Sequence, residues 1–164
     1  MNIYLLRHAQ AKLGFPDRER TLTERGRGHA QGMGKWLSCS SKELPARIFC
    51  SPLVRAQETL SFLGAAWGGG AMDLAETMEA LVPEGNPEAV ISVIGALNED
   101  VLLVGHNPQM EILASLMMTG ERYGVRLVMK TGVLLRFKRS PYISADEVGL
   151  ADLRWMLDPR TLSD

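Results

Sequence analysis

Short apolar runs and helical patterns alternate along the chain. The runs Asn2–Leu6, Arg47–Cys50 and Val101–Val104 are almost wholly apolar, which is typical of strands buried on both faces. Apolar residues at helical spacing predict helices at about 23–38, 52–66, 86–97 and 107–118. Two final strands are expected, with a weaker candidate before them, at Gly132–Lys138, Leu153–Leu157 and Met72–Met78.

This alternation of strands and helices indicates an α/β fold. We expect a three-layer α/β/α sandwich with a mostly parallel central sheet. The length of 164 residues suits one domain with a substantial core, so a single domain over 1–164 is expected. In sheets of this kind, ligands bind at the carboxyl ends of the strands.

Capping residues mark the expected helix starts. After the second strand, Ser51 is expected to cap a helix that Pro52 opens. The first helix has two candidate caps, because Thr21 with Glu24 fits a capping box and Thr23 fits a simple N-cap. Glycines weaken that helix by about 1 kcal/mol each relative to alanine, and close packing on the sheet is the expected compensation. They are Gly26, Gly28, Gly32 and Gly34.

Composition and charge disfavour several classes of protein. The chain is 46% hydrophobic and 23% charged with a net charge of −1, so no nucleic-acid or membrane surface is expected. No apolar run approaches the roughly 20 residues of a membrane helix. The chain enters a strand almost at once, which predicts no signal peptide. Cys39 and Cys50 lack metal or redox spacing, and Cys50 is expected in the core, so a cytoplasmic protein is predicted.

Each of the three best strands is followed at once by a basic or imidazole residue. The first strand ends at Arg7 and His8, the second leads to Arg55 in an early helical turn, and the third leads to His106. Each residue alone is also typical of a strand end or a helix surface. The recurrence at three equivalent junctions favours one shared site at the sheet edge, beside helix N-termini that attract anions.

Two arginines and two histidines around one point suit phosphoryl chemistry. A phosphoryl group carries about two negative charges near neutral pH, and planar guanidinium groups bind its oxygens bidentately. A neutral histidine nitrogen can attack phosphorus and form a phosphohistidine. Nearby cations lower the pKa of such a histidine and keep it unprotonated.

The motifs in this order resemble those of the histidine phosphatase superfamily, also called the phosphoglycerate mutase-like family, and within it the SixA-type phosphohistidine phosphatases. The matching pieces are Arg7-His8-Ala9, the segment Arg20-Thr21-Leu22-Thr23-Glu24-Arg25-Gly26, the segment Ser51-Pro52-Leu53-Val54-Arg55-Ala56-Gln57-Glu58-Thr59, and Gly105-His106. Ala9 stands where glycine is more usual in the superfamily, a mild departure that also occurs in SixA-like sequences.

The resemblance implies a phosphoglycerate mutase-like fold and a role for each matching residue. It implies that His8 is the phosphorylated nucleophile and that Arg7, Arg55 and His106 form the phosphate pocket. It also implies that Arg20 reaches the pocket from its loop.

The general acid is less well marked by the sequence. Larger relatives carry an acidic residue between the second and third motifs, where this chain has Glu76, Glu79 and Glu84. The segment around Glu84 looks most like the expected loop, so Glu84 is the candidate and Glu79 the next. These carboxylates fit equally well as solvated loop residues.

The segment 67–86 between two predicted helices is too short for a sizeable helical cap over the site. An open cleft would admit a side chain of another protein. By resemblance, the expected function is therefore a phosphohistidine phosphatase whose partner is a histidine-phosphorylated protein. The alternatives are a phosphatase of small phosphomonoesters and a non-catalytic phosphate-binding module, and the intact residues Arg7, His8, Arg55 and His106 disfavour the second.

Neither a metal nor another cofactor is expected, because arginines supply the positive charge and no carboxylates or cysteines cluster at ligand spacing. Turnover should therefore survive dialysis against EDTA, measured as phosphate release before and after treatment. A loss of activity that a divalent ion restores would contradict this expectation.

Overall fold

A six-stranded mixed sheet forms the centre of the computed structural model, which describes residues 1–40, 43–139 and 151–162. The strand order is β3-β2-β4-β1-β5-β6. Strands β1 to β4 run parallel, whereas β5 is antiparallel to β1, and β6 to β5. The strands are β1 (Asn2–Arg7), β2 (Arg47–Cys50), β3 (Ala75–Thr77), β4 (Val101–Gly105), β5 (Leu134–Arg139) and β6 (Ala151–Leu157).

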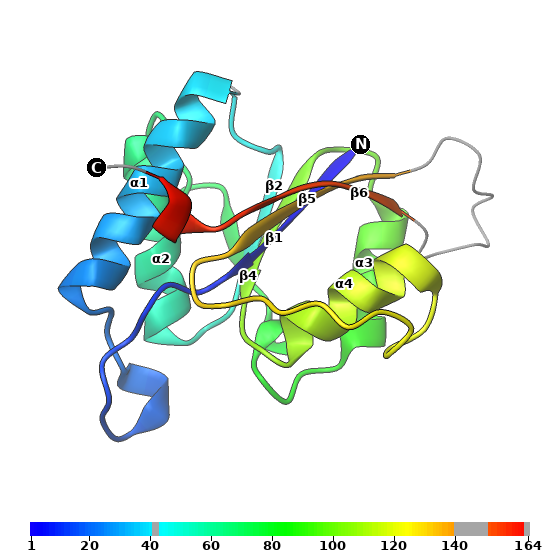
Figure 1. Ribbon diagram of the computed structural model, residues 1–164, viewed down its shortest axis with the longest axis horizontal. Helices are drawn as coiled ribbons and strands as arrows, with labels where there is room; N and C mark the ends of the chain where they lie inside the picture. The colour runs from blue at the N-terminus through cyan, green and yellow to red at the C-terminus, as the bar shows by residue number, and fades with distance from the viewer. Residues whose placement is uncertain (41–42, 140–150, 163–164) are drawn as a thin grey trace.

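Helices cover both faces of this sheet, and Figure 1 shows it between the two helix pairs. The pair on one face is α1 (Glu24–Ser40) and α2 (Val54–Ala66), and the pair on the other is α3 (Pro87–Ala96) and α4 (Gln109–Thr119). Alternate residues of β1 enter the two cores, with Ile3 and Leu5 on the α3–α4 side and Tyr4 and Leu6 on the other. The predicted α/β sandwich with a mostly parallel sheet is confirmed.

Three parallel strands end at the same level on one edge of the sheet. In register, Arg7 lies opposite Gly105 and Cys50 opposite Val104. The first residue after each strand therefore leaves the sheet at this edge. Backbone hydrogen bonds extend the pairing of the strands to these residues. His8 N donates to Gly105 O at 2.9 Å, and Ser51 N donates to Val104 O at 2.9 Å.

The predicted elements exist, but two helix starts differ from expectation. Ser51 and Pro52 do not begin α2, which starts at Val54, and the Ser51 hydroxyl bonds a histidine instead of capping the helix. Similarly, α4 begins at Gln109, one residue after Pro108. In both cases the residues after the strand are used at the sheet edge, so the helix begins later. At α1, Thr23 is the cap, because its Oγ1 accepts from Gly26 N at 3.0 Å.

The glycines of α1 have two different environments. A Cβ atom at Gly26 would collide with the carbonyl oxygen of Gln10, and one at Gly34 with that of Leu63, so close packing explains these two glycines, although it is against the loop after β1 and against α2 and not on the sheet as expected. The expectation is wrong for Gly28 and Gly32, where an added Cβ meets nothing within 4 Å. These two line an open groove on the outer face of the helix.

The segment 67–86 between α2 and α3 holds the short strand β3 and the one-turn helix η2 (Glu79–Leu81). Gln109 Nε2 donates to Ala80 O at 2.7 Å, which fixes η2 beside the start of α4. Among the described residues, no helix is long and apolar enough to cross a membrane. Cys50 is buried in the core as expected, and Cys39 is exposed.

Two substitutions on α1 should have opposite effects on stability. Gly26→Ala should lower the free energy of unfolding by about 1–3 kcal/mol, because its methyl group overpacks against fixed backbone. Gly28→Ala should raise it by up to about 1 kcal/mol, because alanine is the better helix former and the site is open. Urea unfolding of both variants tests this, and equal effects would contradict the packing argument.

Candidate active site

His8 lies at the carboxyl end of β1 and is only 8% exposed. Its Nδ1 is 2.7 Å from Ala9 O. A carbonyl oxygen can only accept a hydrogen bond, so Nδ1 carries the proton of the neutral ring. The lone pair is then on Nε2, which is the arrangement a nucleophilic histidine requires.

The loop after His8 is tied to the start of α2. Ala9 N donates to Thr59 Oγ1 at 3.0 Å, and the Thr59 hydroxyl donates to Arg55 O at 2.6 Å. Thr59 is fully buried. Thr59, the last residue of the segment 51–59 found in the sequence, therefore connects the backbone of the loop after His8 to the backbone of Arg55.

His106 follows β4 and faces His8, with a ring-centroid separation of 4.7 Å and an interplanar angle of 47°. The imidazole is 1% exposed, and its Nε2 lies 2.9 Å from the Oγ of fully buried Ser51. When the Ser51 hydroxyl donates in this bond, the proton of neutral His106 is on Nδ1. Nδ1 can then donate to a bound anion.

Both histidines are neutral at pH 7. The pKa of His8 is lowered to about 4, first by burial and then by the guanidinium groups of Arg55 and Arg7, against the bond to Ala9 O. The pKa of His106 is lowered to about 3, again first by burial and then by His8 and Arg55. The site therefore holds an unprotonated imidazole among fixed cations.

Arg55 is in the first turn of α2, with a side chain only 5% exposed. Its Nη1 donates to Asp17 O at 2.8 Å and its Nη2 to Asp17 Oδ2 at 3.0 Å. Arg20 donates to the other carboxylate oxygen at 2.8 Å and, through Nε, to Lys12 O at 2.7 Å. The two guanidinium groups thus meet at one carboxylate, and they lower the pKa of Asp17, Arg20 foremost.

The guanidinium group of Arg7 is held by a different loop, the one that follows α4. Its Nη1 donates to Met129 O at 2.6 Å. Asn107 Nδ2 also donates to that oxygen, at 3.0 Å, and Met129 N donates to Glu111 Oε1 at 2.8 Å. The first turn of α4 therefore fixes the loop that positions the Arg7 guanidinium.

Three buried nitrogens of the site have no hydrogen-bond partner among the described residues. They are Arg7 Nε, Arg55 Nε and His106 Nδ1. An unsatisfied buried polar group costs about 1–3 kcal/mol, so such groups are kept where a ligand satisfies them. Guanidinium N–H groups are donors only, and the ligand they suit is an oxyanion.

The comparisons with known proteins agree with this geometry. Residues 3–81 match the model of the histidine phosphatase superfamily, branch 1. A phosphohistidine phosphatase SixA homolog of Haemophilus influenzae is 34% identical over 126 residues, covering 71% of this chain and 77% of its own length. The chain belongs to the histidine phosphatase superfamily.

Solved structures resemble this histidine phosphatase along nearly its whole length. The protein histidine phosphatase SixA complexed with tungstate superposes with a TM-score of 0.86 at 26% identity, covering 99% of this chain and 100% of the other. A structure attributed to the phosphohistidine phosphatase SixA of Agrobacterium tumefaciens gives 0.75 at 25% identity, covering 96% and 97%. The predicted family and the SixA-type resemblance are confirmed.

The structure separates the candidate glutamates of this histidine phosphatase. Glu76 on β3 pairs with Arg47 at 2.5 Å, so it is engaged on the sheet. Glu79 begins η2 just past the end of β3 and lies 3.9 Å from Arg18, on the loop that carries Asp17. Glu84 is exposed in the turn before α3, and its role as the acid stays a prediction.

Sequence reasoning missed Asp17, Glu111 and Met129, and gave Ser51 the wrong role. Asp17 had a usable signal, since it lies three residues before the predicted pocket residue Arg20. Met129 acts through its backbone, which leaves no mark in the sequence. No group of three or more metal-ligating side chains occurs within the described ranges, and the expectation of no metal stays a prediction.

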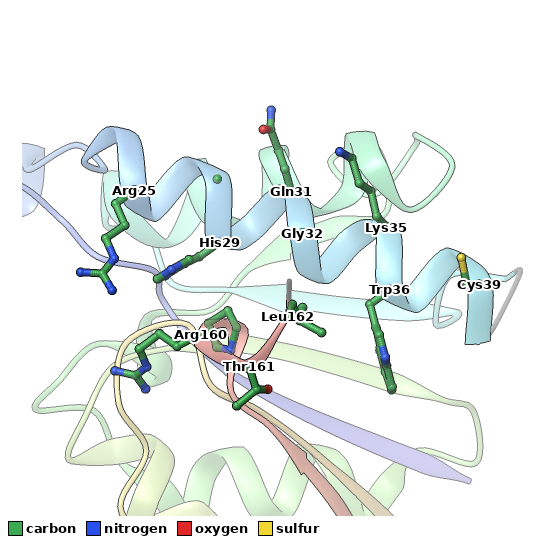
Figure 2. A pocket seen from close by; sticks show the side chains of 12 residues that line it. Arg25, His29, Gln31, Gly32, Lys35, Trp36, Cys39, Arg160, Thr161 and Leu162 are labelled. Carbon is green, nitrogen blue, oxygen red and sulfur yellow. The ribbon is translucent and has the colours of Figure 1, made fainter. Parts of the chain in front are cut away.

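A groove lies away from these residues. It has a volume of about 950 Å³ and lies between α1 and the C-terminal turn η3 (Pro159–Thr161). Figure 2 shows Arg25, Lys35 and Arg160 among the side chains that line it. Gly28 and Gly32 line it, which is why they have open space above them. Arg160 bonds Asp158 through two of its nitrogens, so part of the positive charge is neutralised within the protein.

The neutral histidines predict a pH-dependent stability. Unfolded histidines bind protons below their ordinary pKa of 6.5, whereas folded His8 stays neutral to about 4 and His106 to about 3. The unfolded chain therefore binds more protons in this window, and the free energy of unfolding should fall as the pH falls, by at most about 1.4 kcal/mol per pH unit for each histidine.

Urea unfolding of the wild type and of His106→Asn, at neutral and at mildly acidic pH, measures this dependence. The substitution should reduce the acid-induced loss of stability, because one buried neutral imidazole is gone. Carboxylates titrate in both proteins and cancel in the comparison. Parallel stability curves would show that His106 does not contribute.

Proposed function

We propose that this histidine phosphatase removes the phosphoryl group from a histidine-phosphorylated protein through a covalent phosphohistidine on His8. The observation that carries the proposal is the Nδ1 bond of His8 to a backbone carbonyl, which leaves Nε2 unprotonated beside fixed cations. The names of the relatives, phosphohistidine phosphatases of the SixA type, support the same substrate class.

In the proposed first step, His8 Nε2 attacks phosphorus as the bond from phosphorus to the substrate imidazole breaks. The departing imidazole takes up a proton. In the second step, water attacks the phosphohistidine, inorganic phosphate leaves, and neutral His8 returns. Arg7 and Arg55 would bind the phosphoryl oxygens and stabilise the charge they carry in each transition state.

His106 and Arg20 complete the proposed pocket. His106 Nδ1 would donate to a phosphoryl oxygen while Ser51 holds the other ring nitrogen. Arg20 lies beside Arg55, joined to it through Asp17, and would contribute further positive charge. Tungstate, bound by a relative of 26% identity, is an oxyanion with the geometry such a pocket accepts.

Glu84 remains our proposed general acid, with Glu79 next. Glu79 has the support of its place just beyond the carboxyl end of β3 and its proximity to Arg18. An imidazole leaving group can also take its proton from water, so phosphohistidine needs this acid less than a phosphate ester does.

We also propose a single domain over 1–164 that acts in the cytoplasm. The free thiols of Cys39 and Cys50 support a reducing compartment. The segment 67–86 contributes only β3 and η2 beside the site, which supports a pocket open to a protein substrate.

Substitution of His8 tests the proposed nucleophile. Wild-type protein mixed with a phosphorylated substrate should trap an acid-labile, alkali-stable phosphoenzyme, and His8→Ala should lose both the phosphoenzyme and turnover. His29→Gln is the matched control, because it removes the histidine of α1 and should leave the phosphoenzyme intact. Substantial turnover by His8→Ala would exclude His8 as the nucleophile.

A further inference from the structure

The loop 12–20 between β1 and α1 carries the most exposed large apolar side chains on the described surface. Leu13 is 95% exposed and Phe15 is 97% exposed. Figure 1 shows this loop standing out from the body of the molecule, below α1 and α2. Scattered exposed apolar residues are ordinary, but two in three residues on one projecting loop mark an interaction surface.

The loop is fixed at its base. Lys12 N donates to Thr21 O at 2.8 Å, and an antiparallel bridge joins Ala11 to Leu22. The Arg20 guanidinium crosses the loop to Lys12 O at 2.7 Å. The apolar tip is therefore presented on a loop whose base is closed by hydrogen bonds.

The same loop reaches the phosphate pocket on its inner side. Asp17 lies two residues beyond Phe15 and accepts hydrogen bonds from Arg55 and from Arg20. The apolar tip and a wall of the pocket thus belong to one short segment. A surface that touches Phe15 lies two residues along the chain from Asp17, the acceptor of Arg55.

A second loop has the same combination of features. Val128 is 62% exposed, and the next residue, Met129, accepts from the Arg7 guanidinium. Partly buried Arg7 and buried Arg55 are therefore each held by a loop that also presents an apolar side chain to solvent. We call the three exposed side chains on these two loops, Leu13, Phe15 and Val128, the apolar rim.

Because the nucleophile His8 is buried, the substrate has to contact this rim in order to bring its phosphoryl group to the histidine. His8 is 8% exposed and His106 is 1% exposed, so the phosphoryl group must descend between the loops to react. Histidine is a short side chain, and a phosphohistidine can reach that depth only when the backbone that carries it comes down to the rim. A free phosphorylated amino acid has no such surface and leaves the rim in water.

We propose that Leu13 and Phe15, with Val128 on the second loop, are the docking surface for the histidine-phosphorylated partner protein. This inference rests on the proposed function. The partner it fits is a folded protein with a phosphohistidine on a convex surface, such as a helix face, and apolar side chains beside it. Large apolar side chains that become buried at the centre of an interface carry most of its binding energy.

The variants Leu13→Ser and Phe15→Ser, singly and together, test the proposal. The substrates are a histidine-containing phosphotransfer domain phosphorylated on its histidine, and free phosphohistidine. The double variant should lose about tenfold or more in kcat/KM on the phosphorylated domain, mainly through KM, and nothing on free phosphohistidine. Val128→Ser should show a smaller loss of the same kind.

Met72→Ser and Leu74→Ser are the matched controls. These side chains are 46% and 45% exposed, and they precede β3, at the edge of the sheet opposite to the pocket. Both controls should keep wild-type kcat/KM on the two substrates. Because all of the replaced side chains are exposed, urea unfolding should give wild-type stability throughout.

The outcomes separate this inference from the proposed function. If the wild type does not hydrolyse the phosphorylated domain, the proposed function fails and the docking surface with it. If the wild type hydrolyses it and the loop variants do so equally well, the docking surface alone is wrong. Equal losses on both substrates would make the loop part of the pocket instead. A dimer that the variants dissociate, with unchanged kinetics, would assign the tip to a second copy of this chain.

Discussion

Crowding of cationic groups at one desolvated sheet edge is the constraint on which the rest of the structure depends. Burial is the main cause that lowers the pKa of each of the two imidazoles, and the nearby guanidinium groups of Arg55 and Arg7 lower it further. Positive groups placed this close together repel one another, which is unfavourable unless each cation is hydrogen-bonded to acceptors. The protein supplies these acceptors from outside the sheet, which leaves the sheet edge itself free for an anion.

The acceptors come from two loops that are far apart in sequence. Asp17 holds Arg55 from the loop before α1, and Met129 O holds Arg7 from the loop after α4. Glu111 in turn binds the Met129 amide, so the second loop is fixed by a helix. The parallel strands place the cations, but the loops set their orientation. Each loop thus has a hydrogen bond to one guanidinium group of the site.

The features that the sequence predicted are those with a strong local cause. The apolar run predicted β2 at Arg47–Cys50 with the correct bounds, because its last three residues are buried and only Arg47 is partly exposed. The helix expected at about 86–97 also starts within one residue of the observed α3, because the Asn86 side chain accepts hydrogen bonds from the amides two and three residues ahead. The helix start at Ser51 was not, because the hydroxyl bonds His106, which is 55 residues away in sequence. A tertiary contact of this kind overrides the preference of serine to cap a helix. Met129 is harder still to predict, because it acts through a backbone carbonyl oxygen that every residue has.

The segment 67–86 has no helical insertion to cover the site, so under the proposed function the substrate protein itself would have to cover it. Enzymes usually exclude water by closing a lid, and exclusion strengthens the electrostatic interactions inside the site. Here β3 and η2 are the elements between α2 and α3, and the loop tip at Leu13 and Phe15 stays in solvent. The surface of the partner protein would then exclude water from the pocket as it docks. Under the same proposal, a small phosphate ester brings no such surface and would be a poorer substrate than a phosphoprotein.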